Sequence, residues 1–437
     1  RLGTQTSNRS SLVCRTYRRE RTNLSVQTQP NGNPLISVLK LKDYRSFWVA
    51  QFIAQLIAGA LRFAFLWHAP NLGDVVWTVP LMAISTALPA FIVSLPAGAI
   101  ADRMNHRIYC IILSAATAVL LLLTGALLLA DLLNLYLAVL MSFLLGATGA
   151  AGMPVYQAMV PKLVGSELLA SGVALQNLGM MASMVIGAVL GGGLIQFLGM
   201  DLSFLTWAAL MLLSTLLFFV MNYDTNDQTQ SNKSLSSLVP DIMTGIRFTF
   251  SNEPLRSLTL AGFVMGFGGG AYQTLVPEIG RYQLGLDAGM TSLMFGLMSG
   301  GMIISTLIIA SRKNLTAKGR YLLFALNCFG PGLMFIGLST SLWLTFIFLP
   351  LWGLCGGILM TTQRTLLQAN TPSDVMARVM SVNVFASAGL LPLSAGVIFV
   401  FRGFWSAGES MTAIGLIVTL SAVTLAATRR FLWRKSL

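Results

Sequence analysis

The sequence predicts an all-α integral membrane protein with twelve transmembrane helices in two six-helix halves. Apolar residues make up 55% of the chain and charged residues only 10%, whereas a soluble domain carries about 25% charged residues. Long apolar runs recur along the chain, each near the roughly 20 residues that a helix needs to cross a bilayer. A polar stretch after the sixth run divides the runs into two sets.

The apolar runs define the predicted helices in chain order. Each run is long enough to cross a bilayer, and a polar or charged turn separates it from the next. The twelve runs lie near residues 46–67, 75–100, 108–130, 132–160, 168–198, 202–222, 256–277, 288–310, 320–339, 341–362, 375–401 and 407–428.

The runs also set the domain boundaries. Residues 1–45 are polar and basic and lack the apolar residues of a core, so we expect a disordered tail. Residues 46–223 form the N-terminal half and residues 255–428 the C-terminal half. Residues 429–437 form a second basic tail.

Residues 224–254 link the two halves and begin with a polar stretch. Within the linker, Leu238, Ile242, Ile246 and Phe250 recur every four residues, which puts them on one face of a helix. Such a helix is typical of a segment that lies on the membrane surface.

The formal net charge of +13 is distributed unevenly along the predicted topology. All 28 Lys and Arg residues except Arg62, Arg281 and Arg402 lie in the tails or in loops on one side of the membrane. Because basic loops remain in the cytoplasm during insertion, we expect both termini to be cytoplasmic. This placement favours topology and contact with membrane lipids over nucleic-acid binding.

The turn between the second and third predicted helices, residues 95–107, reads LPAGAIADRMNHR. Gly98 permits close helix packing, and Asp102, Arg103 and Arg107 place an acid and two bases at the predicted cytoplasmic end. An acid there can accept hydrogen bonds from a neighbouring helix N-terminus. The bases can pair with acids or lipid phosphates. We expect an inner gate, and the alternative is a turn that only sets topology.

This turn resembles the G-x-L-A-D-R-x-G-R-R loop of the major facilitator superfamily, and the resemblance extends over about residues 40–430. It implies two halves that rock around a central site, with Asp102 locking the inner side against helix eleven. The chain is more narrowly similar to the branch of enterobactin-type exporters and transmembrane secretion effectors. That similarity lies in residues 95–103, 160–164, 174–177, 186–192, 371–381 and 389–393.

The sequence departs from this pattern in two places. The stretch IGAVLGG at residues 186–192 resembles the exporters' G-P-x-x-G-G signature, and we expect Gly187, Gly191 and Gly192 to pack helices closely. Ala188 replaces the proline that would bend this helix, which weakens the inference of antiport. The loop of the second half that corresponds to residues 95–107 is residues 310–320, and it contains bases but no acid. We therefore expect the gate chemistry in the first half.

A polar stripe follows the first predicted helix. Gln51, Gln55, Gly59 and Arg62 share one helical face. A charged residue inside a span usually faces a cavity or a partner, so we predict that Gln55 and Arg62 line a substrate cavity. The alternative is that Arg62 extends to the lipid headgroups near its helix end.

The seventh predicted helix contains a glycine-rich stretch that ends near a proline, which suggests a hinge. We predict that Tyr272 and Gln273 beside it contact the substrate. Glu278 and Asp74 are weak candidates for proton coupling, since a proton carrier needs a carboxyl group that burial favours in its neutral form. The favoured interpretation of Glu278 is an exposed residue of the outer loop.

Methionines repeat on the eighth predicted helix at positions 290, 294, 298 and 302. We expect Met294 and Met298 to line an adaptable apolar pocket. The alternative is a transporter of Cu(I) or another metal ion, because thioethers are soft ligands. Four residues spaced by four extend too far along a helix to share one ion, so no metal site is predicted.

The predicted function is export of a small amphipathic molecule by alternating access, with proton antiport implied by the resemblance. No phosphate-binding loop or catalytic motif appears, so we expect neither an enzyme nor a cofactor. A monomer in the bacterial inner membrane is expected, and an organellar membrane has less support. A non-transporting assembly factor with the same fold is a further alternative.

Overall fold

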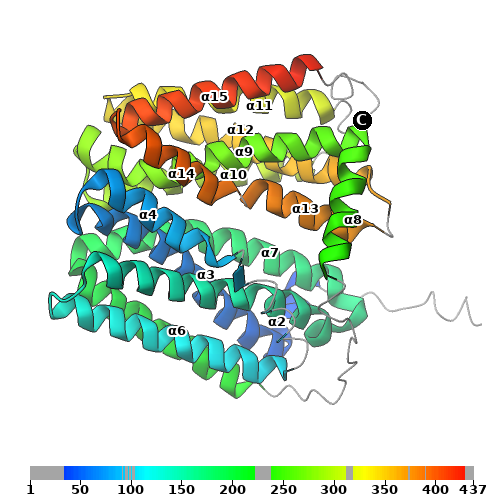
Figure 1. Ribbon diagram of the computed structural model, residues 1–437. Coiled ribbons are helices and arrows are strands. Elements are labelled where there is room, and N and C mark those ends of the chain that lie inside the picture. The colour runs from blue at the N-terminus through cyan, green and yellow to red at the C-terminus, as the bar shows by residue number, and fades with distance from the viewer. Residues whose placement is uncertain are drawn as a thin grey trace, which may run out of the picture.

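The computed structural model describes residues 34–90, 92–93, 97, 100, 104–221, 238–311, 318–372, 375–388 and 390–428. All regular structure in these residues is helical (Figure 1). The first half contains α2 (Pro34–Lys40), α3 (Lys42–His68), η1 (Ala69–Asn71), α4 (Val75–Ala87), α6 (His106–Leu129) and α7 (Leu135–Val220). The remaining elements are α8 (Leu238–Ser251), α9 (Glu253–Glu278), η3 (Ile279–Gln283), α10 (Ala288–Ser311), α11 (Lys318–Leu338), α12 (Leu342–Ala369), α13 (Met376–Ala388), α14 (Leu390–Arg402) and α15 (Ala407–Thr428).

Within the described residues, nine helical stretches are long and apolar enough to cross a membrane. One of them, Ser171–Val220, has 50 residues, which exceeds what one crossing requires. The count of twelve transmembrane helices stays a prediction, because the end of the second predicted helix lies partly outside the described residues.

Helix α7 crosses the bundle three times. Its backbone leaves the helical region at Gly165 (φ 68°) and Gly199 (φ 80°), where the positive φ favours glycine and lets the chain reverse direction. Contacts with α3 show that the second pass runs parallel to α3 and that the third pass runs antiparallel to it. These contacts are Tyr44–Gly172 and Ala60–Gly191 for the second pass, and Phe65–Phe204 and Ser46–Leu217 for the third.

The bundle has two opposite ends, which we call the terminal face and the distal face. The terminal face holds the start of α3 and the end of α15, and α8 lies across it (Figure 1). The distal face holds η1, η3 and the end of α14. The two halves pack together through α4 against α14 and through α7 against α10.

The start of the chain differs from the expected tail. The expectation of disorder does not hold for residues 34–45, which form α2 and the first turn of α3. Val38 of α2 is fully buried in a cluster that includes Tyr44 and Phe47. This short apolar segment folds because α2 packs against α7. Residues 1–33 and 429–437 lie outside the described residues.

Candidate functional site

The polar stripe predicted on the first helix lies on α3. Gln51 is buried and accepts a hydrogen bond at 3.3 Å from Nε2 of Gln176, which also donates to the Tyr156 carbonyl at 2.9 Å. Gln55 is half-buried, and its Nε2 lies 2.9 Å from the sulfur of Met153. The stripe therefore joins α3 to the first and second passes of α7.

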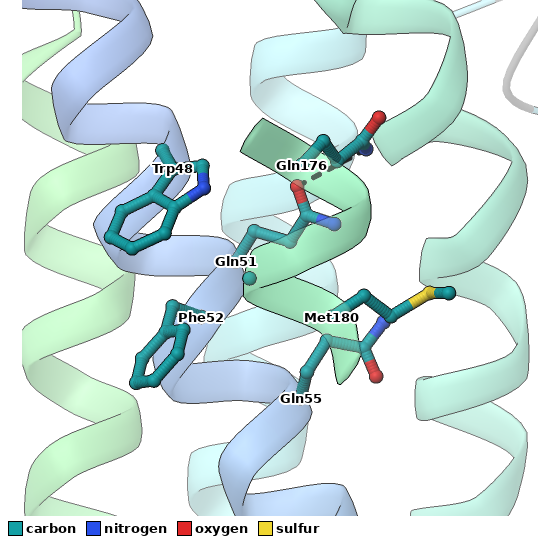
Figure 2. Close-up of a pocket in the computed structure, with 7 residues that line it drawn as sticks. Trp48, Gln51, Phe52, Gln55, Gln176 and Met180 are labelled. Atoms are coloured by element: carbon teal, nitrogen blue, oxygen red, sulfur yellow. Dashed lines mark hydrogen bonds between the residues drawn. The ribbon is translucent and has the colours of Figure 1, made fainter. Parts of the chain in front are cut away.

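A shallow pocket lies between α3 and the second pass of α7 (Figure 2). Gln51 and Gln55 reach from α3 toward the side where Gln176 and Met180 lie. Aromatic rings of Trp48 and Phe52 form another part of the lining, stacked with centroids 5.4 Å apart. The lining thus combines amide groups with aromatic and thioether surfaces, but it encloses only about 170 Å³ in this state, which is less than the roughly 300 Å³ of a small-molecule site.

Arg62 lies further along α3 and reaches the other half of the protein. Its exposed side chain donates a hydrogen bond at 2.8 Å to Oε1 of Gln273 on α9. A charged residue inside a span costs about 2.5–3.5 kcal/mol on insertion scales. An amide oxygen compensates this cost only in part, because it carries no net charge. The bond brings together two predicted site residues that are 211 positions apart.

Other contacts join the two halves near the distal face, and we call this set, with Arg62–Gln273, the distal gate. Arg281 of η3 donates to Asn71 at 2.9 Å, and its guanidinium lies 5.3 Å from the centroid of the Trp67 ring. The rings of Trp77 and Phe399 are also in contact, with their centroids 4.4 Å apart. The hydroxyl of Ser292 donates a hydrogen bond to the carbonyl oxygen of Val189 at 3.2 Å. In the described residues, these polar and aromatic contacts link the two halves near the distal face.

The three predicted packing glycines lie where helices approach closely. A Cβ at Gly187 or Gly191 would overlap α3, with the nearest atoms in Leu56 and Ala60. A Cβ at Gly192 would instead overlap Ser292 of α10, which belongs to the second half. Two of the glycines therefore pack the first half internally, and Gly192 lies in the distal gate.

Glu278 is buried, so its interpretation as an exposed loop residue is wrong. Only 4% of it is exposed, and one carboxylate oxygen forms an ion pair with Arg402 at the end of α14. It stays inside because the helical chain continues through Pro277 into η3 and keeps Glu278 against α14. The pair borders a cavity of about 590 Å³ at the distal face. Asp74 is exposed and caps α4 by accepting from the backbone N–H of Val76 at 3.1 Å.

Tyr272 and Met294 lie in the core of the second half rather than on a cavity wall. Tyr272 is 1% exposed, and its hydroxyl donates to the Met294 carbonyl at 3.1 Å. Met294 is fully buried, and Met298 is partly buried where α10 meets Gly353 of α12. The cause is that α9 turns Gln273 toward the first half and its neighbour Tyr272 into its own half. Among the described residues, no group of three or more His, Cys, Asp or Glu could hold a metal ion.

Three of the predicted inner-gate residues, Gly98, Asp102 and Arg103, lie outside the described residues. Arg107 lies inside them and bonds within the first half. Its Nε donates to the Phe218 carbonyl at 3.3 Å and its terminal nitrogen to the Phe219 carbonyl. Arg107 thus caps the end of α7, where free carbonyls favour a cation.

The sequence reasoning missed several residues of the site. Gln176 lines the pocket and was not predicted to, although it lay in a stretch already noted for its resemblance. Arg281 and Arg402 each bond near the distal gate. The sequence did set them apart, because Arg281 and Arg402 are two of the three basic residues that lie outside the tails and the loops of the terminal face.

Comparison with known proteins identifies related sequences and folds. The profile of the Major Facilitator Superfamily matches residues 47–395. No curated protein sequence matches the chain.

Several solved transporters have a similar fold. The nucleoside transporter NupG is 12% identical, with a TM-score of 0.70 over 90% of this chain and 100% of that one. A peptide transporter, POT, is 16% identical, with a TM-score of 0.68 over 90% and 95%. A bacterial homologue of the human lysosomal transporter Spinster, inward-facing and occupied, is 14% identical, with a TM-score of 0.65 over 90% and 97%. At these identities the likeness shows the fold alone.

Proposed function

The chain belongs to the major facilitator superfamily, and we propose that it is a secondary active transporter that exports a small amphipathic molecule by alternating access. The observation that carries this proposal is the hydrogen bond from Arg62 to Gln273, which crosses between the halves on the same face of α3 as the polar pocket. A binding surface and a gate contact on one helix suit a site that both halves enclose in turn.

The closed distal gate corresponds to one state of this cycle. With the distal side held by the contacts of Arg62, Arg281, Trp77 and Ser292, substrate enters from the terminal face. The positive-inside asymmetry supports a cytoplasmic terminal face, so this state is the one in which an exporter would take up its substrate. The protein acts as a monomer in the bacterial inner membrane, with both termini cytoplasmic.

When the halves rock, the distal contacts separate and an inner gate forms. Asp102, with Gly98 and Arg103, supplies that inner gate at the terminal face. Arg107 supports it indirectly, because its bonds to the end of α7 hold the start of α6 in place.

Protons drive the cycle through Glu278. Its second carboxylate oxygen is buried and has no hydrogen-bond partner among the described residues, so it can take up a proton without losing a bond. Protonation would weaken the pair with Arg402, and thereby the link between α9 and α14, both of which contribute to the distal gate. Exposed Asp74 is less suited, since it already caps α4.

Proteoliposomes that contain the pH dye pyranine test this proposal. A pH gradient is imposed, and dansylglycine, dansylglycinamide and dansylcadaverine are added in turn as anionic, neutral and cationic amphipathic probes. We expect at least one probe to cause proton movement that requires the protein. No protein-dependent proton movement with any probe would contradict proton-coupled export and favour an assembly factor, whereas a response to Cu(I) alone would favour a metal transporter.

A disulfide across the distal gate tests whether this gate must open during transport, and a second disulfide within the first half serves as the matched control. In V189C/G296C the two Cβ atoms would be 4.0 Å apart, within the range of native disulfides, and the bond would join α7 to α10. Oxidation should stop proton movement and reduction should restore it. In P89C/G146C the Cβ atoms would be 3.7 Å apart within the first half, and oxidation there should leave transport intact. The four native cysteines are replaced in both variants.

A further inference from the structure

Arg62 has no acidic partner in the part of the chain that the structure describes. The ion pair found there joins Glu278 to Arg402, and no described carboxylate lies within ion-pair distance of Arg62. Its hydrogen-bond partner is the amide oxygen of Gln273. A guanidinium has five N–H donors, so most of its donors remain available.

A ligand anion would bind Arg62 more strongly than Gln273 does. Carboxylate, sulfonate and phosphate oxygens carry charge and can accept two parallel bonds from a guanidinium, whereas an amide oxygen is neutral. The Arg62 side chain lies where α3 meets α9 of the other half and is not enclosed by protein on every side, so separation of the halves would give a ligand access to it. Gln273 therefore occupies the position that an anion would take.

The side chains along α3 toward the terminal face have the chemical character to contact an apolar body attached to that anion. The pocket residues Gln55 and Phe52 precede Arg62 by seven and ten positions on α3, which is about 10–15 Å along a helix. The pocket there includes the rings of Trp48 and Phe52 and the flexible thioether of Met180. A molecule with an anionic head at Arg62 and an aromatic or aliphatic body of that length would contact both regions.

We infer that the substrate is an amphipathic anion whose charged group binds Arg62 and displaces Gln273. This inference rests on the proposed function and adds the chemical class of its substrate. Displacing Gln273 removes a bond between the halves, so substrate binding itself weakens the distal gate. Because the anion and Gln273 compete for one guanidinium, the ligand binds better to the state in which that contact is open.

Equilibrium binding in nanodiscs tests the inference without requiring transport. The fluorescence polarisation of dansylglycine is compared with that of its uncharged amide, dansylglycinamide, in nanodiscs of phosphatidylcholine. We expect dansylglycine to bind at least tenfold more tightly, R62Q to abolish this difference, and R62K to retain part of it. Equal affinities, no binding of dansylglycine, or unchanged selectivity in R62Q would overturn the inference.

The Gln273→Ala variant shows whether Gln273 competes with the anion for Arg62 or instead helps to bind the anion. If Gln273 holds the place of the anion, Q273A should bind dansylglycine several-fold more tightly than the parent protein. Weaker binding in Q273A would contradict the displacement step. Adding phosphatidylglycerol to the nanodiscs identifies the source of the anion: competition supports an anionic lipid, and no competition supports a water-soluble anion.

The outcome can be separated from that of the transport proposal. Proton movement with dansylcadaverine but not with dansylglycine would leave export standing and reject the anion. Charge-selective binding through Arg62 without any proton movement would leave the anion site standing and reject proton-coupled export.

Discussion

Replacing Gly192 with alanine should shift the protein away from the state with the distal side closed. A Cβ at Gly192 would lie 2.5 Å from the carbonyl oxygen of Ala288 and would also overlap Ser292. Both neighbours belong to the second half, so the overlap exists only while the halves are in contact there. Overpacking of this kind costs about 1–3 kcal/mol, which changes the ratio of the two states about 5- to 150-fold.

The adjacent glycine provides the control for this prediction. Apart from its chain neighbours and its own helix backbone, a Cβ at Gly193 would have no atom within 4 Å, so Gly193→Ala should leave the ratio unchanged. The assay uses a cysteine at position 62 and a membrane-impermeant thiol reagent applied from the distal side. We expect faster labelling in the Gly192→Ala background than in the Gly193→Ala background. Equal labelling rates would refute the assignment of Gly192 to the distal gate.

Three further substitutions test separate parts of the structure. Arg402→Leu leaves the buried Glu278 carboxylate unpaired and should cost about 3–5 kcal/mol of stability, measured by thermal unfolding in detergent; R402L/E278Q should lose less, and an equal loss would contradict an ionised pair. Replacing Met294 and Met298 together with Leu, a swap of similar volume, should leave probe preference in proteoliposomes unchanged, because Met294 lies in the core of the second half; a changed preference would place these side chains on the cavity, and complete loss together with Cu(I) binding by the parent would favour a metal transporter. Asp102→Asn should slow or abolish transport at equal membrane insertion, and normal rates would remove Asp102 from the inner gate.

The sequence predicted the helical class and the polar face of α3 because both depend on local pattern. Helical spacing alone puts Gln51, Gln55 and Arg62 on one face. It cannot reveal that Arg62 meets Gln273, because this contact depends on how α3 and α9 are placed in the folded bundle. The same applies to Glu278, whose partner Arg402 is 124 positions away.

The methionine stripe shows why periodicity left the cavity uncertain. A spacing of four tells which residues share a face of α10 but not what that face contacts. Met294 faces the core of its own half, and cavity lining would require the same spacing. Likewise, the hinge-like stretch before Pro277 gave no indication that Tyr272 and Gln273 point to different halves, because adjacent helical residues are about 100° apart around the axis.

The labelling of a cysteine at position 62 from each side of the membrane tests alternating access most directly. Whole cells expose the distal side to an impermeant thiol reagent, and inside-out vesicles expose the terminal side. We predict labelling from both sides in the free protein, and from the terminal side alone once V189C/G296C is oxidised, with distal labelling restored by reduction. Labelling from one side only, whatever the redox state of that pair, or no labelling at all would contradict a central site that opens to each side in turn.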